Sequence, residues 1–157
     1  MIEDLFYSMK LDVKCLFSNY ELKLYKYFYK KTRVFPQIII SIKNFLFFFV
    51  KNQDYFRAKS RVKFLKIGIS NKKIMVIRKE KTIIRLILAF FPDLYVHRIF
   101  FTIDETNADI IMKVIFLTDL DRLIAIGGKN GTYIKLVNQI FNKYIYPLKL
   151  QCEVGFL

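Results

Sequence analysis

Apolar positions in the second half of the chain recur at intervals that change from segment to segment. Residues 82–91 repeat their apolar side chains at helical spacing and are followed by Pro92, which predicts a helix that stops there. Residues 97–103 and 110–117 are β-prone runs on either side of a polar turn, so they predict an antiparallel hairpin. Residues 119–126 predict a short helix that leads into a glycine cluster.

Beyond the glycine cluster, residues 132–141 place apolar side chains on one helical face, and residues 144–148 predict a closing strand. The first half shows the same order with weaker signals: a helix at 2–9, strands at 20–29 and 37–42, helices at 44–50 and 57–66, and a strand at 73–77. Residues 71–74 (NKKI) also recur as 142–145 (NKYI). We therefore predict an α+β chain made of two copies of one module of about 70 residues.

Two aromatic stretches of the first half allow alternative interpretations. In residues 20–29, Tyr and Leu alternate with Lys, so this expected strand either presents stacking rings beside cations or is an ordinary half-buried strand. The phenylalanine-rich run at 45–49 is expected to be the buried side of a short helix, whereas an exposed run would mark a partner surface.

The charge of the chain points to an anionic partner. The 157 residues include 27 Lys and Arg against 13 Asp and Glu, a formal net charge of +14, which favours a nucleic acid or a membrane surface. The 54% hydrophobic content requires a test for membrane spans. The best candidates, residues 35–50 and 82–91, are shorter than the roughly 20 apolar residues needed and carry charges, so we predict no span.

The remaining composition argues against metal or redox chemistry. Cys15 and Cys152 lie far apart and His97 is the one histidine, so we expect a reduced compartment, no metal site and no cofactor. The first ten residues contain two acids and resemble neither a secretory signal nor a transit peptide. Together with a bias towards Lys, Ile, Phe, Tyr and Asn, this favours a plastid-encoded protein, or alternatively a cytoplasmic protein of a reduced AT-rich bacterium.

Three of the five glycines fall within residues 127–131. Gly128 and Gly131 enclose Lys129 and Asn130 in a GxxG pattern, so the backbone can turn tightly between two helices and approach a phosphate without an intervening Cβ. The N–H groups and the dipole at the start of the next helix favour an anion at the same place.

The neighbours of this loop complete a candidate binding site. Lys129 and Lys135 add positive charge, and Ile126 and Ile134 are placed to line an apolar groove. This layout resembles the loop of KH domains, which clamps about four nucleotides of single-stranded RNA backbone. The alternative is that residues 127–131 form only a turn between two helices.

A wider resemblance covers nearly the whole chain. Residues 119–136 (DLDRLIAIGGKNGTYIKL) resemble the second KH loop of the NusA family of bacterial transcription factors, and residues 87–96 (ILAFFPDLYV) resemble the helix linking its two KH domains. Shorter matches come from the first half, at residues 21–24, 31–34, 38–42 and 60–62. The resemblance implies two tandem type II KH domains, each a three-stranded sheet packed on helices, over residues 1–79 and 80–157.

The first of these domains is degenerate. Its GxxG position carries Phe56-Arg57-Ala58-Lys59, without the glycines that close phosphate approach requires. Its basic residues still supply diffuse attraction to an RNA backbone, or alternatively form a solvated helix face: Arg57, Lys59, Arg61 and Lys63.

The resemblance implies a function without catalysis, single-stranded RNA binding. We expect a reduced NusA-like elongation, termination or antitermination factor, without the family's N-terminal polymerase-binding and S1 domains, that acts on nascent RNA with a bacterial-type (plastid) RNA polymerase. An organellar ribosomal or ribosome-assembly KH protein that binds rRNA is one alternative, and a membrane-surface protein is another. No nucleophile or nucleotide-binding loop is visible, so we do not expect an enzyme.

Overall fold

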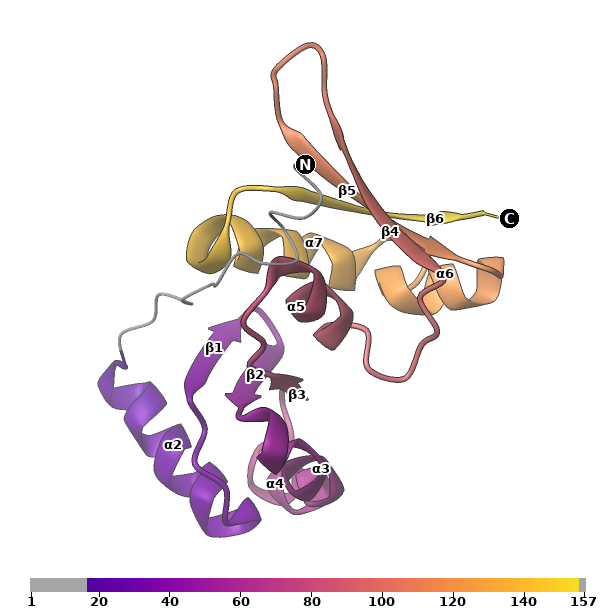
Figure 1. Ribbon diagram of the computed structural model, residues 1–157. Coiled ribbons are helices and arrows are strands. Elements are labelled where there is room, and N and C mark those ends of the chain that lie inside the picture. The colour runs from indigo at the N-terminus through magenta and orange to yellow at the C-terminus, as the bar shows by residue number, and fades with distance from the viewer. Residues whose placement is uncertain (1–16, 156–157) are drawn as a thin grey trace. The chain divides into compact units, whose positions relative to one another are not determined.

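A computed structural model describes residues 17–155 of the chain (Figure 1). They fall into two units, which meet in sequence between Lys81 and Thr82, two residues from the expected boundary. We refer to residues 17–81 as the first unit and to residues 82–155 as the second unit. Each contains one three-stranded sheet and helices, so the expected α+β class is confirmed. The helix expected at residues 2–9 lies outside the described residues.

The first unit has the order helix, strand, strand, helix, helix, strand. Its elements are α2 (Asn19–Thr32), β1 (Ile38–Ile42), β2 (Phe45–Val50), the short 3-10 turn η1 (Asn52–Asp54), α3 (Tyr55–Ser60), α4 (Val62–Gly68) and β3 (Lys73–Arg78). β2 is the central strand, antiparallel to β1 and parallel to β3. The parallel pair requires the crossover that α3 and α4 supply.

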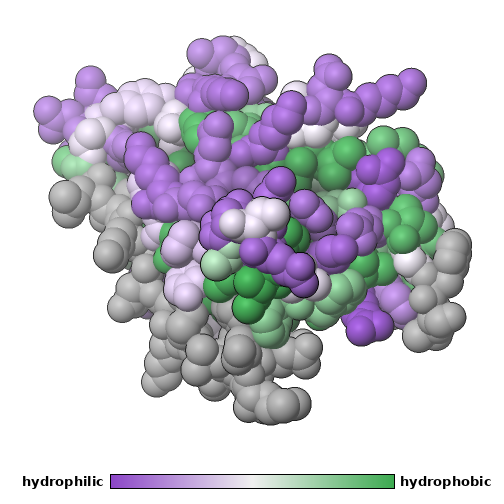
Figure 2. All heavy atoms as spheres, turned by 90° about the horizontal axis from the view of Figure 1, so that it is seen from above, coloured by the Kyte–Doolittle hydropathy of each residue, from purple (hydrophilic) through white to green (hydrophobic). Residues whose placement is uncertain are grey.

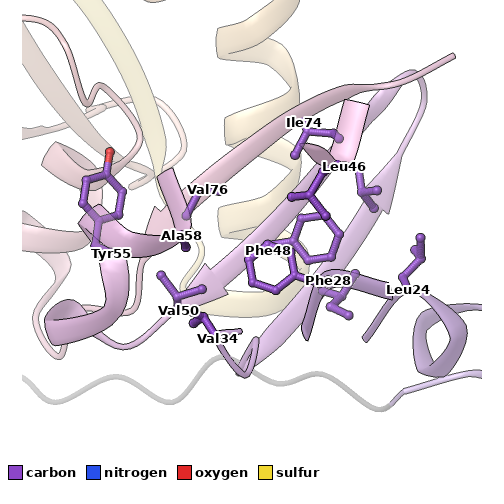
Figure 3. Packing of buried hydrophobic residues seen from close by; sticks show 12 residues of the cluster. Leu24, Phe28, Val34, Leu46, Phe48, Val50, Tyr55, Ala58, Ile74 and Val76 are labelled. Carbon is purple, nitrogen blue, oxygen red and sulfur yellow. The ribbon is translucent and has the colours of Figure 1, made fainter. Parts of the chain in front are cut away.

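Helices α2, α3 and α4 pack on one face of this sheet around a single core (Figure 3). Phe28 of α2 and Phe48 of β2 are fully buried, and their rings stack with centroids 4.3 Å apart. Each such ring stabilises the fold by about 2–3 kcal/mol on burial. The rest of this core comes from every helix and strand of the unit and from Val34 between α2 and β1. It includes Leu24, Val34, Ile39, Leu46, Val50, Tyr55, Ala58, Leu65, Ile74 and Val76.

The strand expected at residues 20–29 is wrong, because this segment lies in α2. Ser18 accepts a hydrogen bond from the Glu21 N–H, and the Glu21 carboxylate accepts one from the Ser18 N–H, which forms a capping box. The buried residues Leu24, Phe28 and Thr32 are spaced four apart, the period of a helix. The high β-propensity of tyrosine outweighed these two signals in the prediction.

The helix expected at residues 44–50 is also wrong, because β2 occupies this run. All six residues of β2 are buried, and the strand pairs on both sides. A central strand with a parallel neighbour is buried on both faces and reads as a continuous apolar run, which short-range periodicity cannot distinguish from a buried helix. The expected burial of the phenylalanines is confirmed, and the strand expected at 37–42 is confirmed as β1.

The second unit repeats the same order of elements. These are α5 (Ile83–Ala89), β4 (Arg98–Ile103), β5 (Ile110–Phe116), α6 (Asp119–Ile126), α7 (Thr132–Ile140), the π-helical turn η2 (Phe141–Ile145) and β6 (Lys149–Val154). β5 is central, antiparallel to β4 and parallel to β6, as β2 is in the first unit. The expected hairpin and the helices before and after it are confirmed.

The closing strand expected at residues 144–148 begins later, at Lys149. The helical backbone continues through η2, and the Tyr146 N–H donates to the Phe141 carbonyl at 2.8 Å. The Asn138 side chain then holds the strand, because it accepts from the Leu150 N–H at 2.7 Å and donates to the Leu150 carbonyl at 3.2 Å.

The two units therefore share an order of elements and a sheet topology, but no constant spacing. The first strands start 60 residues apart, at Ile38 and Arg98, and the last strands start 76 residues apart, at Lys73 and Lys149. The second unit is longer in its connections. The letter match between residues 71–74 and 142–145 falls on different elements, since the latter lie in η2.

Candidate nucleic-acid interface

Gly127 ends α6. Its backbone is left-handed (φ 85°, ψ 39°), its N–H donates to the Ile124 carbonyl at 3.2 Å, and the Gly128 N–H donates to the Leu123 carbonyl at 2.9 Å. This pair of bonds is a Schellman motif, which satisfies the last carbonyls of a helix. A Cβ at Gly127 would lie 2.6 Å from the Tyr133 Cβ, so a side chain is excluded there. Gly127 is therefore a helix terminator.

Gly128 and Gly131 then enclose a separate turn. The Gly131 N–H donates to the Gly128 carbonyl at 2.9 Å, which closes a four-residue turn with Lys129 and Asn130 exposed at its tip. A Cβ at Gly128 would meet no atom within 4 Å, and one at Gly131 would only touch the Ile134 Cγ2 at 3.5 Å. The space beside these two glycines is open, in contrast to Gly127. The GxxG pattern of the sequence, which starts at Gly128, agrees with this geometry.

The first turn of α7 follows directly on this turn. Its N-cap is Gly131, which has no side chain to cap the helix, and no acid lies in the first turn. By contrast α2, α5 and α6 begin with hydroxyl caps. The first N–H groups of a helix have no partner within the helix and carry partial positive charge. They suit an anionic oxygen at Gly128–Gly131.

The structure brings the other predicted residues of this site to the same loop. Ile126 ends α6 and Ile134 lies in the first turn of α7, and both are half-buried. Lys129 and Lys135 are exposed. The Thr132 hydroxyl donates to the Gly127 carbonyl at 3.0 Å and ties the two helix ends together. The geometry is a glycine turn in which residues 128–130 are exposed and Gly131 is buried, with cations and apolar side chains beside it.

The first unit contains no comparable turn within its described residues. Residues 51–61 join β2 to α4, whereas the corresponding connection in the second unit spans residues 117–131 and is four residues longer. The expected equivalence of residues 56–59 with Gly128–Gly131 is wrong, since residues 56–59 lie within α3. The helices change direction at Arg61, which is both the C-cap of α3 and the N-cap of α4.

The basic residues predicted for the first unit lie on or between these two helices. Arg57, Arg61 and Lys63 are exposed, and Lys59 is half-buried with its Nζ 5.6 Å from the centroid of the Tyr55 ring. They belong to a different unit from the glycine turn, so the candidate residues form two groups.

The net charge is divided unequally between the units. Residues 17–81 contain 17 Lys and Arg against three acids, whereas residues 82–155 contain eight against seven. Two cations of the second unit also pair with acids, Lys113 with Glu153 at 3.4 Å and Arg122 with Asp119 at 2.8 Å. The first unit therefore accounts for the basic character of the chain. Figure 2 shows one face of the molecule, where hydrophilic residues surround smaller hydrophobic areas.

Two exposed apolar residues of α6, the helix that precedes the glycine turn, were not among the predicted site residues. Leu120 and Ile124 of α6 are 67% and 56% exposed. They are four apart and so share one face of the helix. That spacing was visible in the sequence, but only the structure shows that this face is exposed.

Comparisons with known proteins concern the fold alone. No protein-family model and no curated protein matches the chain. Among solved structures, the protein named in "Crystal structure of APE1850" is similar to 88% of this chain and to 100% of its own length, with a TM-score of 0.65 and 21% identity. The likeness supports an α+β fold with two three-stranded mixed sheets. Among residues 17–155, no helix is both long and apolar enough to span a bilayer.

Proposed function

We propose that this chain binds single-stranded RNA through two tandem type II KH domains, with the backbone clamp at Gly128–Gly131. The observation that carries the proposal is the open glycine turn between α6 and α7, in front of a helix that begins without a side-chain cap. A phosphate can approach the turn closely because no Cβ intervenes at Gly128.

The order of elements supports the same proposal. In each unit, helix, strand and strand precede two helices and a strand, and the central strand is antiparallel to the first and parallel to the last. This is the arrangement that the resemblance to KH domains leads us to expect. KH domains clamp about four nucleotides at the GxxG loop, with bases beside it. Ile126 and Ile134 would contact those bases, and Lys129 and Lys135 would neutralise phosphate.

The test replaces both glycines of the turn. Gly128→Asp with Gly131→Asp introduces two negative side chains where phosphate would approach, and we expect at least a tenfold loss of affinity for an unstructured RNA oligomer at physiological salt. Asn107→Asp with Ala108→Asp is the matched control. It adds the same charge at an exposed hairpin turn where Ala108 already has a positive φ of 59°, a conformation that Asp tolerates. Unchanged affinity of the glycine variant would refute the clamp.

A second measurement separates steric from electrostatic effects. Gly131 has φ 61° and ψ 38°, a conformation that asparagine adopts readily, so Gly131→Asn adds a neutral side chain with little strain.

Each lost phosphate contact reduces the steepness of the plot of log K against log salt by about 0.7 for single strands. Lys129→Gln should show this change, whereas Lys143→Gln, at the far end of α7 and η2, should not.

The cellular role we propose is that of a NusA-like factor that acts on nascent RNA with a bacterial-type RNA polymerase. It rests on the sequence resemblance together with the proposed RNA binding. Purification of the tagged protein from its native cells after nuclease treatment tests this role, and we expect polymerase subunits to co-purify. Stable association with ribosomal particles instead would contradict the transcription role and favour binding of rRNA.

A further inference from the structure

The strongly basic first unit carries an aromatic surface along α2, from Phe17 just before the helix to Phe35 just after it. The rings form a row: Phe17 and Tyr25 have centroids 6.0 Å apart, and Tyr25 and Phe35 are 6.2 Å apart. Tyr29 and Phe35 stack at 4.3 Å with only 13° between their planes. We call these four rings together with Arg33 the α2 aromatic surface.

The rings of this surface remain open to solvent. Phe35 is 53% exposed and Phe17 is 36% exposed, although both are large apolar side chains. Tyr25 and Tyr29 are half-buried. Of the three ring contacts, only that of Tyr29 with Phe35 is stacked, whereas the other two are edge-on or tilted. A partly exposed row of flat rings can receive a further planar group.

Arg33 adds a cation to the row at a position where arginine is unusual. It is the C-cap of α2 with φ 61° and ψ 22°, and its N–H donates to the Tyr29 carbonyl at 2.8 Å. Glycine or asparagine ordinarily occupies this left-handed position, because a larger side chain is strained there. The Arg33 guanidinium lies 5.9 Å from the centroid of the Tyr29 ring. The side chain at this strained position, Arg33, thus places a positive charge next to the row of rings.

The surroundings of the row are basic. Lys26 and Lys30 of α2 are exposed, and Glu21, in the first turn, is the only acid of the helix. An anionic partner with flat apolar groups matches this combination of cations and rings. Single-stranded RNA has both features in alternation along its chain.

We propose that the α2 aromatic surface is a second contact site for single-stranded RNA, in which bases stack on Phe35 and Tyr29 while Arg33, Lys26 and Lys30 neutralise phosphates. The site lies in the unit that has no glycine turn among its described residues. This inference rests on the proposed function, because the ligand is again single-stranded RNA, but the residues are different. The strongly basic first unit would bind RNA by base stacking, and the second unit by the backbone clamp.

The first test is Phe35→Leu, which keeps an apolar side chain but removes the π-face. We expect a loss of affinity for a 20-nucleotide unstructured RNA of about fivefold or more, as for one lost base–aromatic stack. Phe100→Leu is the control, because it removes a half-buried ring that lies 4.9 Å from Arg98 within the nearly neutral second unit. Its affinity should stay within twofold of the parent. Equal losses in both variants would overturn the proposal.

The second test uses the strained arginine. Arg33→Gly removes one positive charge and relieves the left-handed strain, so the variant should be at least as stable as the parent yet bind RNA about threefold or more weakly. Lys43→Gly is its counterpart: Lys43 is exposed in the same unit, has φ 50° and loses the same charge. If both variants weaken RNA binding equally, general electrostatic attraction accounts for the result and the proposal is wrong.

The outcomes separate this site from the glycine clamp. Failure of the parent protein to bind any RNA refutes both. If Gly128→Asp with Gly131→Asp abolishes binding while Phe35→Leu and Arg33→Gly bind normally, only the α2 aromatic surface is refuted. Photo-crosslinking of 4-thiouridine RNA should label peptides from residues 25–35. Binding to anionic vesicles that persists in Phe35→Leu, with no crosslink in this segment, would instead assign the surface to a membrane and contradict the proposal.

Discussion

The phenolic hydroxyl of Tyr133, in the first turn of α7, donates a 2.6 Å hydrogen bond to the backbone carbonyl of Phe90 at the end of α5. Tyr133 is 8% exposed, and its Cβ occupies the space that a side chain at Gly127 would need. One tyrosine thus joins the helix that follows the glycine turn to the helix that opens the second unit. The position of the turn depends on this buried contact.

Tyr133→Phe removes that hydrogen bond and keeps the ring. Because the loss of a buried hydrogen bond costs about 1–2 kcal/mol, we expect the free energy of unfolding in urea to fall by this amount. RNA affinity should fall as well, since α7 loses its attachment beside the turn. Tyr95→Phe, at a residue that is 65% exposed, is the control and should change stability by less than about 0.5 kcal/mol. Equal stability of the two variants would show that the Tyr133 hydroxyl contributes nothing.

Alanine substitutions should distinguish the roles of Gly127 and Gly128. Gly127→Ala combines left-handed strain with a Cβ only 2.6 Å from the Tyr133 Cβ, so we expect a loss of about 3 kcal/mol. Gly128→Ala meets open space and bears only the cost of its φ of 90°, about 1–2 kcal/mol. Chemical denaturation measures both. The reverse order of stability would contradict the assignment of Gly127 as the helix terminator.

Thr32 is fully buried and connects α2 to the segment before β1. Its hydroxyl donates to the Phe28 carbonyl at 2.8 Å and accepts from the Val34 N–H at 3.1 Å. Thr32→Val keeps the shape but leaves the buried Val34 N–H without this acceptor, so we expect a loss of about 1–3 kcal/mol in urea denaturation. Thr32→Ser keeps the hydroxyl and should recover most of that stability. Equal losses in the two variants would mean that the methyl group, not the hydroxyl, matters.

Burial raises the pKa of the Cys152 thiol from 9.0 to about 12, partly offset by the charge of Arg122. In a Cys15→Ser variant, alkylation at pH 8 should therefore be at least about tenfold slower in the folded than in the urea-unfolded protein, because the thiolate is the reactive form. Cys152 is half-buried, and equal alkylation rates in the two states would contradict the raised pKa of its thiol.

The same shift has a consequence for stability at high pH. The unfolded chain loses the Cys152 proton from about pH 9, while the folded chain keeps it to about pH 12. The free energy of unfolding should thus decrease as pH rises above 9. Cys152→Ala should reduce this decrease, which pH-dependent urea titrations can measure.

Local signals in the sequence were sufficient for the second unit as far as α7, but not for its closing strand, which begins only at Lys149. Pro92 and the polar turn before Ile110 mark the ends of the helix and the hairpin, and the glycines at 127–131 mark the junction of α6 and α7. The turn residues of the candidate site were predicted because glycine conformations are local properties of the backbone. The exposed face of α6 at Leu120 and Ile124 was not predicted, since exposure depends on what packs nearby.

Local signals misled in the first unit. The run FLFFFV is compatible with a buried helix or a buried strand, and only its pairing with β1 and β3 makes it the central strand. Residues 20–29 show the opposite case, since Ser18 and Glu21 already encode a capping box that outweighs the β-propensity of four tyrosines. The match between residues 71–74 and 142–145 did not identify equivalent elements, because the two units share a topology but not a constant spacing.

The sequence by itself determined the α+β class, the net charge and the glycine turn, because these follow from composition, periodicity and local backbone freedom. The tertiary structure decided that a side chain is excluded at Gly127 and has open space at Gly128, because that depends on the position of the Tyr133 Cβ. It also placed Phe35 against Tyr29 and Arg33 at the end of a helix. These side chains meet because α2 ends at its cap and the chain then turns into β1. The spacing of residues along the sequence does not predict such contacts.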